Sequence, residues 1–202
     1  MKKYLFLILI VAISCNKMLD EDVVTNVTDD FYNTPGGFTT AVNSSYAGLR
    51  NFYSTERGMT VSVFGTDTYT NGSDGDFKFA NQYTSQLNPS YAHLREIWNG
   101  LYQAINVCNV VTTRADAIPG LDSVAKVSGV AQARFCRANY YFILLQLFGE
   151  VPLNLKENTT IETEAHRDPV AAIYAAVISD LQYAATVLPA SQTDWGRATK
   201  PA

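Results

Sequence analysis

The sequence of 202 residues has little charge and, in particular, little positive charge. Charged residues make up 17% of the chain, and 15 lysines and arginines stand against 19 aspartates and glutamates, for a net charge of −4. A nucleic-acid partner requires a basic face, so this composition argues against one. Disordered chains are poor in apolar residues, whereas 47% of this chain is hydrophobic, which predicts a folded domain with its own core.

The residues that carry most enzyme and metal chemistry are also scarce. The chain has two histidines, His93 and His166, and neither forms a recognisable metal site or a pairing with a nucleophile. Its carboxylates are scattered, so no glycosidase pair can be nominated. We therefore expect no catalytic residue, no metal and no cofactor. Cys108 and Cys136 fall in apolar helical patterns, where thiols usually act as small core side chains, and the sequence alone does not decide whether they form a disulfide.

The N-terminal apolar run, residues 4–13, is too short to cross a membrane, because a spanning helix needs about 20 apolar residues. It follows Lys2 and Lys3, and a cationic start before a short apolar run is typical of an export signal. Ser14 and Cys15 come directly after the run. We therefore expect the chain to be exported.

The sequence around Cys15 resembles the lipobox of bacterial lipoproteins, whose cysteine is acylated and becomes the mature N-terminus. Ala12 stands where leucine is usual, a looser form similar to that of Bacteroidetes lipoproteins. We expect residues 1–14 to be removed as a signal peptide, and an acylated Cys15 to hold the protein on a lipid bilayer. Residues 15–35 would then be the lipidated cysteine and a polar tether. The alternative is ordinary secretion, with Cys15 lost or free.

Four segments carry apolar residues at the three- and four-residue spacings of amphipathic helices. The predicted helices cover residues 36–50, 91–115, 123–148 and 169–188, the last with Asp168 as its N-cap and Pro169 in its first turn. Between the first two, residues 51–91 are rich in Thr, Ser, Gly and Asn and predict a long loop, with a short strand over Thr60–Phe64. The predicted fold class is all-α, with antiparallel helix pairs like those of tetratricopeptide repeats and a long loop-rich insertion.

The third predicted helix carries a distinctive sequence, GVAQARFCRANYYF over residues 129–142. It resembles the SusD/RagB family of outer-membrane glycan-binding lipoproteins from Bacteroidetes. The likeness continues through LFGEVPL at 147–153, residues 167–181 and GRAT at 196–199, and it covers nearly the whole mature chain. Because this family continues well beyond such a length, we expect residues 36–202 to be its N-terminal helical domain, truncated and with an exposed apolar face.

The resemblance implies a function in nutrient uptake. It implies a protein on the cell exterior, anchored in the outer membrane, that binds starch-like or other glycans. It also implies a partner, a SusC-like TonB-dependent transporter that receives the oligosaccharide, and no enzymatic activity. The alternative from a different class is a helical-repeat scaffold that binds peptide or protein and has no glycan role.

The loop over residues 66–88 supplies the groups that a saccharide requires. Aromatic planes cover the C–H faces of sugars, and polar side chains form hydrogen bonds with their hydroxyls. The candidate ligand-binding residues combine both kinds, namely Asp67, Tyr69, Asn71, Asp74, Phe77 and Tyr83. The alternative is that the aromatic side chains pin the loop to the helices and the polar ones only form turns.

Overall fold

The computed structural model describes residues 29–70, 72, 77–160 and 163–200. The predicted lipidation site, Cys15, and two candidate ligand residues, Asn71 and Asp74, lie outside these residues. The chain divides into a first unit that ends at Phe31 and a second that begins at Tyr32. The second unit holds the core, the hollows and the side chains considered below.

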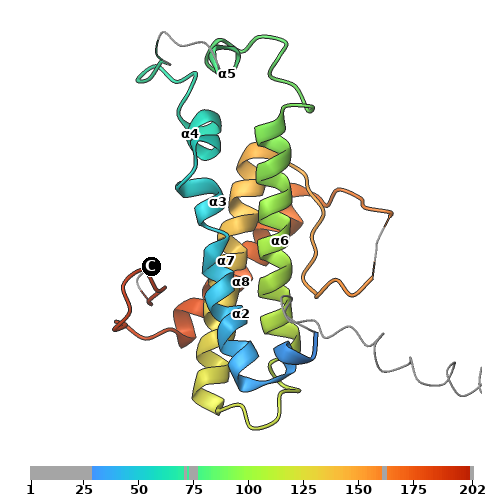
Figure 1. Ribbon diagram of the computed structural model, residues 1–202, viewed down its shortest axis with the longest axis vertical. Coiled ribbons are helices and arrows are strands. Elements are labelled where there is room, and N and C mark those ends of the chain that lie inside the picture. The colour runs from blue at the N-terminus through green and yellow to red at the C-terminus, as the bar shows by residue number, and fades with distance from the viewer. Residues whose placement is uncertain (1–28, 71, 73–76, 161–162, 201–202) are drawn as a thin grey trace, which may run out of the picture. The chain divides into compact units, whose positions relative to one another are not determined.

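The secondary structure of the described residues is helical, which confirms the predicted all-α class (Figure 1). In chain order the elements are the 3-10 helix η2 (Asp29–Asn33) and the α-helices α2 (Pro35–Ala47), α3 (Arg50–Tyr53), α4 (Glu56–Ser62), α5 (Lys78–Gln82), α6 (Ala92–Arg114), α7 (Ser123–Phe148) and α8 (Val170–Val187). Successive long helices run antiparallel, as α6, α7 and α8 show (Figure 1). The prediction of antiparallel helix pairs is therefore confirmed.

The core surrounds α7, which packs against α8, α6 and α2. Leu101 and Leu144 are fully buried, and burying a side chain of this size contributes about 1.5–3 kcal/mol. Gly129 allows the close approach of α2, because a Cβ at this position would lie 2.5 Å from a ring carbon of Phe38. Figure 1 shows α2 and α6 side by side in front of α7.

The two cysteines of the core are free thiols that serve as small apolar side chains. Cys108 and Cys136 are fully buried, and neither forms a disulfide. Burial raises the pKa of the Cys108 thiol to about 12, and it also raises the pKa of Cys136 well above its ordinary value. Both thiols therefore stay protonated and unreactive at neutral pH.

Both ends of α7 are closed by residues that suit helix ends. The Asp122 carboxylate accepts a hydrogen bond from the amide of Ala125 at 2.9 Å, as an N-cap does. Gly149 ends the helix with a φ of 70°, a conformation that is inexpensive only for glycine.

The predicted cap of α8 is wrong. Pro169 occupies the N-cap position, and the Asp168 carboxylate accepts a hydrogen bond from the amide of Leu153 at 2.8 Å instead. The backbone amide of Asp168 also donates to the carbonyl of Val151 at 3.1 Å. Asp168 therefore joins the two ends of the 150–169 segment, a long-range contact that sequence spacing does not reveal.

The described part of the predicted loop contains three short helices, and the strand predicted over Thr60–Phe64 is wrong. Residues 56–62 form α4, where the Thr60 hydroxyl donates to the carbonyl of Glu56 at 2.8 Å. Thr60 is buried in a region where α4 packs against α6. Tertiary packing of this kind overrides the weak preference of β-branched residues for strands.

Candidate functional site

The candidate ligand residues lie in the segment that connects α4 to α6. This segment covers the end of the unit where α6 begins, and α5 lies within it (Figure 1). Four of the six candidates, Asp67, Tyr69, Phe77 and Tyr83, belong to the described residues.

Two of these candidates line a polar hollow of about 340 Å³, here called the loop hollow. Its lining residues are Gly65, Thr66, Asp67, Thr68, Tyr69, Thr70 and Asn81. The Asn81 carboxamide links two other lining residues, since its Oδ1 accepts a hydrogen bond from the amide of Gly65 at 3.0 Å and its Nδ2 donates one to the Thr70 hydroxyl at 3.2 Å. The hollow is therefore held in shape by its own hydrogen bonds, while 63% of Tyr69 remains exposed.

Tyr83 lies next to the loop hollow through its contact with Gly65. Its hydroxyl donates to the carbonyl of Gly65 at 3.3 Å, and its own backbone is left-handed, with a φ of 54°. Gly65 also has a positive φ, 80°, and a Cβ there would lie 2.6 Å from the Tyr83 ring. The sequence therefore needs glycine at this position, and most of the Tyr83 side chain faces solvent.

Phe77 has different surroundings. The centre of its ring lies 5.0 Å from the centre of the His93 imidazole. The neighbouring Phe79 and Tyr91 rings meet edge to face, with their centres 4.9 Å apart. The Tyr91 hydroxyl and His93 Nδ1 are 2.7 Å apart and share a hydrogen bond. Burial, with two glutamates nearby, raises the pKa of Tyr91. These rings fasten the segment to the start of α6, the anchoring role that was the alternative for the loop aromatics.

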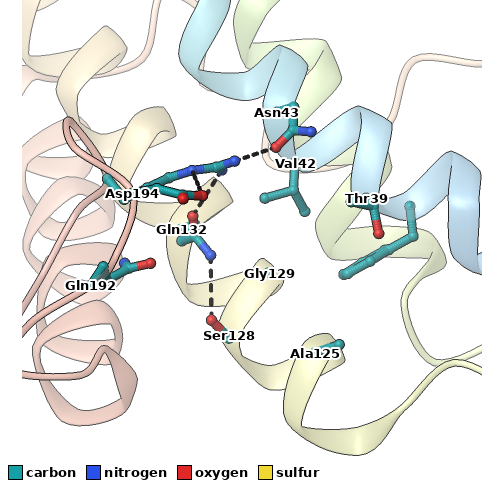
Figure 2. Close-up of a pocket in the computed structure, with 11 residues that line it drawn as sticks. Thr39, Val42, Asn43, Ala125, Ser128, Gly129, Gln132, Gln192 and Asp194 are labelled. Atoms are coloured by element: carbon teal, nitrogen blue, oxygen red, sulfur yellow. Dashed lines mark hydrogen bonds and ion pairs between the residues drawn. The ribbon is translucent and has the colours of Figure 1, made fainter.

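A second hollow, of about 230 Å³, lies between α2, α7 and the segment that follows α8 (Figure 2). The Arg197 guanidinium donates to Gln132 Oε1 at 3.2 Å and to the Asn43 carboxamide oxygen, and it lies over the Tyr46 ring. Gln132 in turn donates to the Ser128 hydroxyl at 3.3 Å. Because these polar groups bind one another, this network fastens the segment to the helices, and Arg197 is the residue of the GRAT sequence that forms these contacts.

A third hollow, of about 480 Å³, is mainly apolar. It is lined by Leu87, Asn88, Pro89, Leu94, Arg95, Trp98, Phe148 and Arg167. The Trp98 and Phe148 rings meet edge to face, with their centres 5.0 Å apart, and two arginines, Arg95 and Arg167, belong to the lining. The sequence does not predict this hollow, because its walls come from segments that are distant in the sequence.

The fold and these hollows describe a helical scaffold that carries its candidate site on a surface segment. A family model described as SusD-like, starch-binding and associating with the outer membrane matches residues 20–202. The chain belongs to this SusD-like family.

Individual relatives agree with this assignment. SusD-like protein P2 of Formosa agariphila is 29% identical, over 95% of this chain and 39% of the relative. A SusD-like protein of Bacteroides ovatus is 30% identical, over 50% of this chain and 19% of its own length. The chain therefore spans about two fifths of the length of the first of these relatives.

Solved structures share the fold. A laminarin binding SusD-like protein matches 81% of this chain and 37% of its own, with a TM-score of 0.70 and 24% identity. A SusD superfamily protein from Bacteroides vulgatus matches 84% of this chain and 38% of its own, with a TM-score of 0.71 and 22% identity. A structure with xylogluco-oligosaccharide has a TM-score of 0.65 and 22% identity, over 81% of this chain and 32% of its own.

Proposed function

We propose that this chain is part of an outer-membrane lipoprotein that binds oligosaccharides and passes them, unaltered, to a SusC-like TonB-dependent transporter. The family description, which names starch binding and the outer membrane, supports the glycan and the location. Two proteins of similar fold are described as laminarin binding and as a structure with xylogluco-oligosaccharide. The lipid anchor at Cys15, the outward orientation and the transporter rest on the lipobox and on the resemblance.

The observation that carries the proposal is the exposed Tyr69 ring at the edge of the polar loop hollow. A folded chain usually buries rings of this size, and an exposed ring beside polar groups is suited to the C–H face of a sugar. The Asp67 carboxylate and the neighbouring threonine hydroxyls are then placed to form hydrogen bonds with the sugar hydroxyls. Since Asn81 holds the hollow in shape, little conformational freedom is lost on binding.

The Tyr69→Ala variant tests this site. Loss of the ring removes apolar contact with the sugar, and we expect the affinity to fall about tenfold, equivalent to about 1.4 kcal/mol. The measurement is retardation of the native protein in gels that contain laminarin or xyloglucan. Asp67→Ala should weaken retardation as well, because it removes a hydrogen-bond acceptor.

The matched control is Tyr53→Ala, because Tyr53 on α3 is also 63% exposed but does not line the loop hollow. This variant should migrate like the unchanged protein. Equal retardation of Tyr69→Ala and Tyr53→Ala would contradict the site. If the unchanged protein binds peptides and is retarded by no glycan, the helical-scaffold alternative replaces the proposal.

A further inference from the structure

A separate groove, here called the amide groove, runs along α6 and has a volume of about 400 Å³. Its lining residues are Trp98, Asn99, Tyr102, Gln103, Asn106 and Asn158. Five of them form two neighbouring rows on α6, at spacings of four residues, and the span from residue 98 to 106 is about 12 Å of helix. Asn158 comes from the 150–169 segment, which lies beside α6 in Figure 1. The amide groove shares no lining residue with the loop hollow.

Both walls of the amide groove are fixed by hydrogen bonds that already exist in the free protein. The Tyr102 hydroxyl donates to the carbonyl of Pro152 at 2.7 Å, and the amide of Asn158 donates to Asn106 Oδ1 at 2.8 Å. The buried Asn109 carboxamide donates to two carbonyls of the same segment, those of Asn154 and Lys156, both at 2.9 Å. A groove that is formed in advance loses little entropy when a ligand enters it.

The chemistry of the lining is uniform. Four of the six residues carry carboxamides, two carry aromatic rings, and none carries a formal charge. Asn99 and Gln103 are exposed, and their side chains form no hydrogen bond within the described part of the chain, so both amides can serve a ligand. A carboxamide offers a donor and an acceptor side by side, which matches neighbouring hydroxyls. An uncharged lining gives no stabilisation to phosphate or to a charged peptide.

We infer that the amide groove is a second saccharide site, which takes a short neutral oligosaccharide and is separate from the loop hollow. This inference rests on the proposed function, because it assumes that the protein meets glycans. The ring faces of Trp98 and Tyr102 cover the C–H face of the sugar, while Asn99 and Gln103 bind its hydroxyls from the solvent side. Two separate sites on one scaffold would strengthen retention of a long chain through multivalency.

Nuclear magnetic resonance tests the amide groove directly, because the chain has only two tryptophans, Trp98 and Trp195. The 15N-labelled protein therefore gives two indole N–H signals, which the Trp195→Phe variant assigns. Laminarihexaose and a xyloglucan heptasaccharide are titrated in turn. We expect the Trp98 signal to shift and to saturate with one of them, while the fully exposed Trp195 provides the internal reference.

The variant Asn99→Ala/Gln103→Ala removes both exposed carboxamides and keeps good helix formers on α6. We expect it to raise the Kd read from the Trp98 signal about tenfold, as the loss of two hydrogen bonds would. The matched control is Gln182→Ala, another exposed glutamine on a helix, which should leave the Kd unchanged.

Two results would overturn the inference that the amide groove binds saccharide, and both would leave the proposed function intact. One is a Trp98 signal that stays still while Tyr69-dependent retardation by the polysaccharide persists. The other is a Kd that is the same in the double variant and in the unchanged protein. Failure of the proposed function has a different signature, since retardation would then be absent in the unchanged protein as well.

Discussion

At the scale of single residues, a buried ion pair joins α7 to α8. The Arg137 guanidinium donates to both carboxylate oxygens of Asp180, at 2.8 and 2.9 Å, and to Asn109 Oδ1 at 2.7 Å. Both residues lie in the interior, and only 5% of each is exposed. A carboxylate is tolerated in the interior because the guanidinium neutralises it.

The Asp180→Ala variant should destabilise the protein by about 3–5 kcal/mol, because it leaves a buried guanidinium without its counter-charge. Urea unfolding followed by circular dichroism measures the change in the free energy of unfolding. The control is Glu96→Ala, which breaks an ion pair with Arg57 in which both side chains are at least 40% exposed. This control should cost about 1 kcal/mol or less. Similar losses in the two variants would contradict the structural role of the buried pair.

Tyrosines that are buried or half-buried should make the fold less stable in alkali. Burial raises the pKa of Tyr46 from 10 to about 12, and it raises the pKa of Tyr102, Tyr140 and Tyr141 as well. Below pH 10 the Tyr46 hydroxyl is protonated in both states, so its stabilising contribution is complete. Between pH 10 and pH 12 the unfolded chain loses this proton first, and the free energy of unfolding falls as the pH rises.

The measurement is the urea midpoint at about pH 9 and about pH 11, compared between variants. Tyr46→Phe removes one titrating group, so its urea midpoint should fall less between the two pH values than that of the unchanged protein. Tyr53→Phe changes an exposed tyrosine, so its urea midpoint should fall as much as that of the unchanged protein. If the urea midpoint depended on pH identically in both variants, Tyr46 would not contribute to the loss of stability in alkali.

At the scale of elements, α8 has a buried face and an exposed apolar face. By length and composition alone this helix could cross a membrane, yet Ile173, Val177 and Ala184 are buried against the rest of the unit. Its other face exposes Val170, Tyr174, Ile178 and Leu181. This face of α8 is therefore apolar and open to solvent within the described residues.

Two isoleucines of α8 differ sharply in burial and allow a matched comparison. Ile173 is fully buried and Ile178 is 52% exposed. Ile173→Ala should lower the free energy of unfolding by about 2–5 kcal/mol, because it opens a cavity between α7 and α8. Ile178→Ala should change it by less than about 1 kcal/mol, since no cavity forms. Chemical denaturation of both variants checks this, and equal losses would contradict the packing of α8.

At the scale of the whole molecule, the proposed location depends on Cys15. Cys15→Ala removes the acylation site, so the protein should lose its palmitate label and move from the outer-membrane fraction to the soluble one. Ser14→Ala keeps a small residue before the cysteine and should retain both the label and the membrane fraction. An unlabelled native protein, or a Cys15→Ala variant that stays with the membrane, would contradict the lipid anchor.

The sequence by itself determined the long helices α2, α6, α7 and α8, because their apolar spacing is a local signal, as are Asp122 and Gly149 at the ends of α7. It also placed the core cysteines correctly, since a thiol within an apolar stripe follows the burial of its neighbours. It could nominate Asp67 and Tyr69 as ligand residues, because a segment rich in aromatic and polar side chains is visible without coordinates.

Only the tertiary structure decided which of these side chains share a surface. Phe77 joins His93, Asp168 binds Leu153 instead of capping α8, and Asn158 meets Asn106 across 52 residues. Such contacts depend on how whole helices pack, and packing is set by many weak contacts that no short window of sequence contains. The long helices could therefore be predicted from local periodicity, whereas the short helices α3, α4 and α5, the hollows and the amide groove depend on how the chain packs.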